Sequence, residues 1–175
     1  MGPVPGSAPA VSRFALLALT LLLLAAGPAG ASRAEAASAA ELDAAFGRAV
    51  ITVEGGLACH RIGVWLALSA AQRARGLMNV AAMAADRGML FVYPGERRVS
   101  MWMRNTLIPL DMVFVRADGT VANVAADTEP LSLESVYSRG PVSAVLELNA
   151  GVAARLGIEP GRRVYVGQAV RNVVR

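Results

Sequence analysis

The densest group of side chains that could do chemistry lies in residues 101–111, with the sequence MWMRNTLIPLD. Trp102 offers a large stacking face, and Arg104 offers a planar guanidinium that can hold a carboxylate or phosphate through two hydrogen bonds. Asn105 and Thr106 add short hydrogen-bonding groups beside an expected turn. This combination indicates a cleft for a small molecule. The ligand-binding residues expected on this basis are Trp102, Arg104, Asn105, Thr106, Asp111 and Arg75.

Asp111 opens an apolar segment, where a carboxylate is costly to bury unless it is paired. We expect its side chain to meet an arginine, backbone amides or a ligand, and Arg104 and Arg75 are the first partners to test. The alternative is purely structural: residues 105–109 form an irregular turn that Asp111 holds through hydrogen bonds from amides.

A catalytic centre has less support than a binding cleft. His60 is the only histidine and adjoins the only cysteine, Cys59, so no Ser-His-Asp or Cys-His arrangement can be read. The enzyme hypothesis is a hydrolase of a small envelope substrate that uses a pair of carboxylates, Asp111 with Asp86 or Glu147. Glu147 is equally consistent with a strand residue that faces solvent.

Methionine suggests a third function class, a Cu(I)-binding protein. Thioethers are soft ligands, and Met101 and Met103 would point the same way on a strand. Methionine is also a common filler of hydrophobic cores. The site assignment therefore includes no metal, and we expect no cofactor.

The first residues predict export. Arg13 gives a positive start, and residues 14–26 form an uncharged apolar run of the length found in signal peptides, too short to span a bilayer. Residues 29–31 (AGA) offer a signal-peptidase site, and residues 34–36 offer a second. We therefore expect a signal peptide over residues 1–31, a periplasmic or secreted protein, and no stable membrane insertion after cleavage. A retained anchor is the alternative.

Removal of residues 1–31 leaves 144, the size of one domain. Residues 32–47 are rich in alanine and predict a linker or a frayed helix, and residues 48–175 predict a single domain. All 17 basic residues are arginines, scattered singly or in pairs without interleaved aromatic residues, so nucleic-acid binding is not expected. The expected partner of this domain is a small molecule, and the expected state is a monomer.

The elements that must position the cleft are short strands separated by turn residues. They predict a mainly β fold, a compact antiparallel β-sandwich or small barrel with two short helices. The expected strands cover residues 50–54, 57–68, 88–93, 99–104, 108–116, 120–125, 142–148 and 164–170. In the strand over residues 99–104, alternation places Trp102 and Arg104 on one face and Met101 and Met103 on the other.

Two helices have readable boundaries. Ser69 and Gln72 have the spacing of a capping box, which predicts a helix that runs to about Gly76. Asn149 is expected to cap a second helix, which Gly157 ends. A further helical turn is expected over residues 80–85.

Three motifs, residues 73–78 (RARGLM), 86–91 (DRGMLF) and 101–111, resemble the domain of unknown function 192 family (DUF192), small proteins frequently exported in bacteria. The resemblance covers about residues 50–170. It implies a compact, mainly β fold of sandwich type and little about activity. Three positions depart from the family pattern. Gln72 stands in place of a frequent glutamate, Asn79-Val80 in place of an aromatic or polar residue followed by arginine, and Gly161-Arg162 in place of a frequent Gly-Asp.

Overall fold

The computed structural model describes residues 1–2 and 39–167. The expected signal peptide (beyond its first two residues), residues 32–38 of the expected linker, and residues 168–175 lie outside the described residues. The elements are β1 (Gly47–Gly55), β2 (Ala58–Ala67), α2 (Ala70–Arg75), β3 (Arg87–Arg97), β4 (Ser100–Met101), β5 (Leu110–Val115), β6 (Val121–Thr128), β7 (Val136–Tyr137), β8 (Val142–Asn149), α3 (Val152–Leu156) and β9 (Val164–Tyr165).

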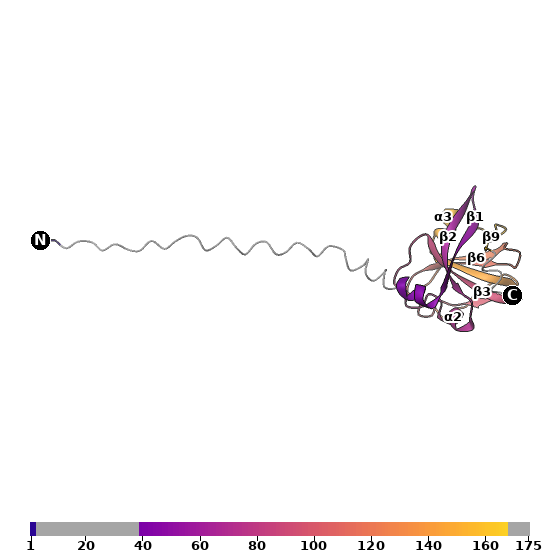
Figure 1. The fold of residues 1–175 in the computed structure, drawn as a ribbon, viewed down its shortest axis with the longest axis horizontal. Coiled ribbons are helices and arrows are strands. Elements are labelled where there is room, and N and C mark those ends of the chain that lie inside the picture. Colours follow the sequence, from indigo (N-terminus) through magenta and orange to yellow (C-terminus); the bar gives the residue numbers. More distant parts are fainter. Residues whose placement is uncertain (3–38, 168–175) are drawn as a thin grey trace.

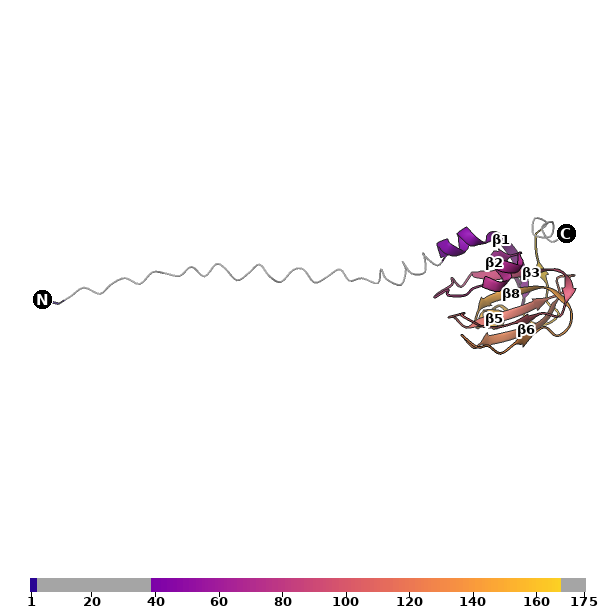
Figure 2. The same ribbon diagram turned by 90° about the horizontal axis from the view of Figure 1, so that it is seen from below.

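Seven of the strands form one curled sheet in the order β6-β5-β8-β3-β2-β1-β9, and β4 pairs with β7 in a small second sheet (Figures 1 and 2). The mainly β, half-barrel fold confirms the expected fold class. All pairs are antiparallel except β2 with β3. That pair runs parallel because α2 and the loop over residues 76–86 carry the chain back to the starting edge.

The two faces of the sheet bury separate apolar clusters, as the period-two alternation of a strand requires. On β5, Met112 and Phe114 belong to the first cluster, whereas Val113 and Val115 belong to the second. The first cluster is covered by α2, by the loop over residues 76–86 and by the loop that follows β4. This covered face carries the candidate site.

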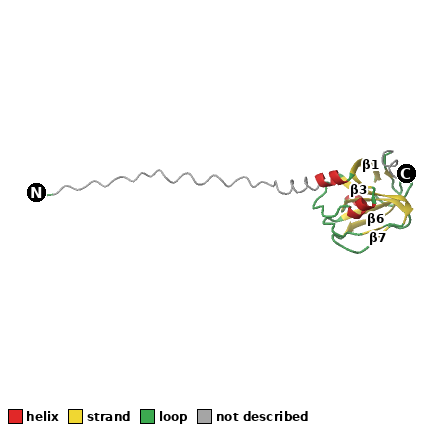
Figure 3. Cartoon of the chain, turned by 60° about the horizontal axis from the view of Figure 1, so that its bottom comes forward, coloured by secondary structure: helices red, strands yellow, loops and turns green. Residues whose placement is uncertain are grey.

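A helix with described residues 39–45 precedes β1 and contributes to the first cluster (Figure 3). Its Leu42 and the following Phe46, four residues apart, are only 2% and 4% exposed. The expected linker therefore takes part in the core from residue 42 onward. None of the helices in the described residues has the length and apolar character that a membrane crossing needs.

Helix α2 begins as predicted. Ser69 Oγ accepts a hydrogen bond from the Gln72 amide at 3.1 Å, and Gln72 Oε1 accepts one from the Ser69 amide at 3.0 Å, which completes a capping box. Gln72 also donates to the Ala45 carbonyl at 3.0 Å and so ties α2 to the preceding helix. Glutamine thus serves the capping role at the position where glutamate is frequent in the family.

Two local predictions are wrong. Asn149 does not cap α3, because its Nδ2 donates to the Met83 carbonyl at 2.8 Å, and Gly151 precedes the helix without a side-chain cap. The helical turn expected over residues 80–85 is absent, since that segment is irregular. Gly157 does end α3, in the left-handed region at φ 69°.

The strand expected over residues 99–104 is shorter than predicted, because only Ser100–Met101 pair with β7. Its alternation is nevertheless confirmed, since Met101 and Met103 are 9% and 1% exposed and Trp102 is 45% exposed. Residues 102–109 continue as a loop that arches over the first cluster. The last strand is likewise short, since β9 includes only Val164–Tyr165.

Candidate functional site

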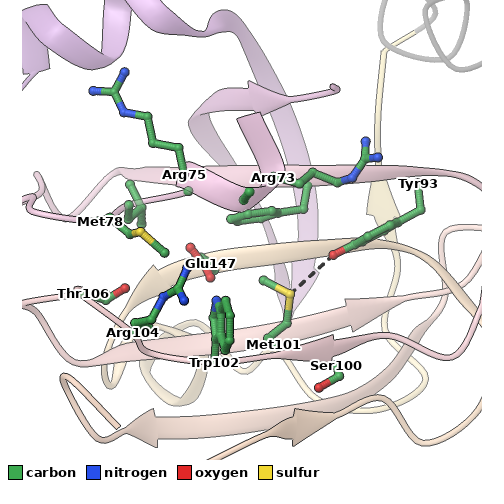
Figure 4. A pocket seen from close by; sticks show the side chains of 14 residues that line it. Arg73, Arg75, Met78, Tyr93, Ser100, Met101, Trp102, Arg104, Thr106 and Glu147 are labelled. Carbon is green, nitrogen blue, oxygen red and sulfur yellow. Dashed lines mark hydrogen bonds between the residues drawn. The ribbon is translucent and has the colours of Figure 1, made fainter. Parts of the chain in front are cut away.

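A pocket of about 100 Å³ opens on the covered face of the sheet, between α2 and the loop that follows β4 (Figure 4). Its volume corresponds to roughly three water molecules at about 30 Å³ each, which suits a small ligand or one end of a larger ligand. The polar or aromatic residues that line it are Arg73, Arg75, Phe91, Tyr93, Ser100, Trp102, Arg104, Thr106 and Glu147.

Trp102 and Arg104 form one wall of the pocket. The guanidinium carbon of Arg104 lies 4.1 Å from the centre of the Trp102 ring, which is the geometry of a cation–π contact. This contact places the guanidinium over the face of an exposed indole. The two ion pairs found among the described residues, Arg48–Asp43 and Arg162–Glu159, do not involve Arg104.

The two arginines of α2 have different surroundings. Arg73 donates to the carbonyls of Leu68 and Val92, the latter at 3.0 Å, and so ties the helix to β3. Arg75 is exposed, lies 5.6 Å from the centre of the Phe46 ring, and forms no ion pair with any described residue. Arg104 is therefore the guanidinium with free donors at the pocket, since the Arg75 side chain points away from it (Figure 4).

Glu147 is a functional candidate that the expected set of ligand-binding residues omits. It lies on β8, opposite Met89 of β3 and Met112 of β5, and is only 4% exposed. Its carboxyl lines the pocket, and no hydrogen bond to it is found among the described residues. No fully buried side-chain oxygen or nitrogen in this part of the chain lacks a partner, so the Glu147 oxygens open to the pocket. Burial raises the pKa of Glu147 to about 8. The sequence contained one signal of this burial: Glu147 is a lone acid between Leu146 and Leu148, in a strand that is apolar on both faces.

The pKa of Glu147 predicts how stability depends on pH. The carboxyl loses its proton near pH 4.5 in the unfolded chain and near pH 8 in the fold, so between these values the unfolded chain binds fewer protons. The free energy of unfolding should therefore fall as pH rises from about 5 to 8, by on the order of 4 kcal/mol. Urea unfolding at several pH values measures it. Glu147→Gln should flatten this dependence, and equal slopes for variant and parent would contradict the assignment.

Asp111 lies on the opposite face of the sheet from the pocket. Its residue neighbour Met112 pairs with Glu147, and successive side chains of a strand point to opposite faces. The fully buried carboxylate accepts hydrogen bonds from the amides of Asp127 at 3.0 Å and Ala153 at 2.8 Å. Of the partners expected for Asp111, backbone amides are the ones found, and pairing with Arg104 or Arg75 is wrong. It braces β6 and the start of α3.

Of the neighbours Asn105 and Thr106, only Thr106 belongs to the pocket. Thr106 is buried and lines the pocket. Asn105 is exposed, does not line it, and has a left-handed backbone at φ 58°. Asn79 and Leu131 also have positive φ, and the Asn79 amide donates to the Asn105 carbonyl at 2.8 Å, while the Leu131 amide donates to that of Thr106 at 3.1 Å. Backbone strain of this kind gathers at functional sites.

The two methionines of the copper hypothesis, Met101 and Met103, have different surroundings. Met103 is in the core, where its sulfur accepts a hydrogen bond from Thr128 Oγ1 at 3.2 Å. Met101 lines the pocket and accepts from the Tyr93 hydroxyl at 3.4 Å. Within the described residues, no group of three or more His, Cys, Asp or Glu side chains is placed to hold a metal ion.

A second, wider depression of about 480 Å³ lies over β1 and β2. It is lined by Arg48, Arg61, Arg87 and Asp86, none of which is buried. Arg48 is paired with Asp43, and Arg87 lies 5.7 Å from the centre of the Trp65 ring. Because it offers no desolvated polar group, this depression is a weaker candidate than the pocket.

Comparison with known proteins places the chain in a group without a described activity. The family model DUF192, described as "Uncharacterized ACR", matches residues 49–166. A crystal structure of a "putative transcription regulator" from Sinorhizobium meliloti 1021 is 42% identical, with a TM-score of 0.66 over 68% of this chain and 93% of that chain. A protein of unknown function from Novosphingobium aromaticivorans DSM 12444 is 40% identical, with a TM-score of 0.66 over 68% and 85%. No curated protein matches the chain.

Proposed function

Because the chain belongs to the DUF192 family, whose description names no activity, we propose from the pocket itself that the protein is a non-catalytic binding protein for a small molecule with an anionic group. The observation that supports this most strongly is the wall formed by Trp102 and Arg104, with no carboxylate paired to the Arg104 guanidinium among the described residues. A planar guanidinium fixed over an aromatic ring suits a carboxylate or phosphate.

The composition of the pocket favours binding over catalysis. Its lining includes no histidine or cysteine, and its one acid, Glu147, keeps its proton at neutral pH because burial raises its pKa to about 8. The hydrolase alternative needs a second carboxylate beside Glu147. Asp111 lies on the other face of the sheet, and Asp86 lies in the second depression. The residues that line the pocket therefore include no second carboxylate that could serve as the general base for hydrolysis.

We also propose that the protein works outside the cytoplasm, in the periplasm or as a secreted protein. This proposal is supported by Arg13, by the apolar run over residues 14–26 and by the small residues at 29–31. Mass spectrometry of the N-terminus of the protein recovered from the cell envelope would test it. A mature N-terminus at Ser32 supports export, and an intact Met1 in a cytoplasmic fraction contradicts it.

Regulation of transcription, the role named for the Sinorhizobium meliloti protein, has little support in the residues of this chain. Helices α2 and α3 have six and five residues, shorter than the recognition helices that enter the major groove. We therefore keep nucleic acid out of the proposed function.

Binding of an anion should depend on the wall of the pocket. We expect propionate, succinate or inorganic phosphate to raise the melting temperature of the parent protein and to quench the fluorescence of Trp102. Arg104→Leu should weaken binding by roughly ten- to a hundredfold, because a charge-assisted hydrogen bond contributes about 1.5–3 kcal/mol. Trp102→Ala should weaken it by about fivefold through loss of the cation–π contact.

The matched control is Arg116→Leu, which removes an exposed arginine from the loop between β5 and β6, outside the pocket lining. It should leave affinity unchanged. Equal losses in Arg104→Leu and Arg116→Leu would indicate unspecific attraction of anions to a basic protein and would contradict the proposed site.

A further inference from the structure

Glu147 is a buried carboxyl without a partner at the base of the pocket. Its side chain is only 4% exposed, and Met89 and Met112 flank it on the neighbouring strands. Buried polar groups normally have a hydrogen-bonding partner, and a carboxyl that lacks one is costly. No hydrogen bond to this carboxyl is found among the described residues, and its oxygens open to the pocket, so the pocket is the direction from which a partner can come.

The charges of the pocket have a definite order. The carboxyl lies at the base, on β8, and the free guanidinium of Arg104 lies on the side of the loop after β4, whereas the Arg75 side chain points away from the pocket (Figure 4). A ligand with an anionic group alone would satisfy the Arg104 guanidinium and leave the Glu147 carboxylate without a partner. A ligand that also carries a cationic donor would satisfy both ends.

The size of the pocket limits the length of such a ligand. About 100 Å³ holds roughly three waters, so its two charged groups can be separated by only a few atoms. We propose, on the basis of the proposed binding function, that the ligand is a short amino acid, whose ammonium group pairs with Glu147 while its carboxylate meets Arg104.

This pairing makes binding depend on pH in a definite direction. The titratable and charged residues that line the pocket together with Glu147 are Arg73 and Arg75 from α2, Tyr93 from β3 and Arg104 from the loop after β4, whereas β5 presents the uncharged Met112. Arginines stay protonated, and burial raises the pKa of Tyr93 above 10. Glu147 is therefore the group that changes charge between pH 6.5 and 8.5, and it must lose its proton to pair with an ammonium.

The test uses β-alanine as the probe, with propionate as its match without the ammonium and ethylamine as its match without the carboxylate. We expect the affinity of the parent protein for β-alanine to rise about twentyfold from pH 6.5 to 8.5, following ionisation of a carboxyl with a pKa of about 8. The ammonium of the probe, like that of lysine, stays charged over this range. At pH 8.5 propionate should bind more weakly than β-alanine. Its affinity at pH 8.5 should not exceed its affinity at pH 6.5.

Glu147→Gln keeps the shape of the side chain and removes its charge. This variant should lose the rise of affinity with pH, and the ratio of its affinities for β-alanine and propionate at pH 8.5 should fall at least tenfold below that of the parent. A second measurement needs no variant: calorimetry at pH 7 in buffers of different ionisation enthalpy should show that the parent releases a proton when β-alanine binds.

The outcomes separate this inference from the function on which it rests. If propionate binds as tightly as β-alanine at both pH values, and no proton is released, the amino-acid ligand is excluded while the anion site stands. If neither probe binds and phosphate and succinate also fail, the proposed function itself is overturned.

Discussion

Replacing Asp111 with alanine is expected to lower the free energy of unfolding by about 3–5 kcal/mol without removing any residue that lines the pocket. The carboxylate is fully buried and accepts hydrogen bonds from the amides of Asp127 and Ala153. Alanine leaves both amides without an acceptor, and each hydrogen bond to a charged group contributes about 1.5–3 kcal/mol. Urea unfolding followed by circular dichroism measures the loss.

Asp86→Ala is the matched control, because it removes an exposed carboxylate whose side chain makes no hydrogen bond with the described residues. Its effect should stay within about 0.5 kcal/mol. Asp111→Asn retains one acceptor oxygen, so its loss in the free energy of unfolding should lie between those of Asp86→Ala and Asp111→Ala. If Asp111→Ala unfolds at the same urea concentration as the parent, the bracing role is wrong. If it is stable but loses ligand binding, Asp111 belongs to the site after all.

The second large effect is expected at Gly88, in the middle of the sheet. A Cβ atom there would lie 2.5 Å from the Glu147 carbonyl oxygen and 2.9 Å from Leu148 Cδ2. The first of these is a backbone atom that cannot rotate away, so β3 and β8 must separate locally. We expect Gly88→Ala to cost about 2–4 kcal/mol of stability and to displace the strand that carries Glu147.

Gly47→Ala provides the comparison within the same sheet, since its Cβ would meet only Leu66 Cδ1, at 3.8 Å. It should change the free energy of unfolding by less than about 1 kcal/mol. The Gly88→Ala variant should also flatten the pH dependence of stability if Glu147 moves toward solvent. Equal stabilities for the two alanine variants would show that the sheet absorbs the extra methyl group.

Local signals predicted the parts of the fold that depend on neighbours in the chain. The capping box of Ser69 and Gln72 formed because both hydrogen bonds close within one helical turn. Burial alternated over residues 99–104 even where strand pairing stopped, because the period of an extended chain needs no partner strand. Asn149 failed as a cap because the Met83 carbonyl, 66 residues away, took its side-chain amide.

The sequence alone therefore determined the mainly β class, the α2 boundary and the grouping of Trp102 with Arg104, all of which follow from short-range periodicity and capping. Only the tertiary structure decided that Asp111 meets the amides of residues 127 and 153, and that Glu147 is buried at the base of a pocket. The reason is physical: the partner and the burial of a carboxyl depend on which distant strands and loops cover it. That cover is set by the packing of the whole sheet.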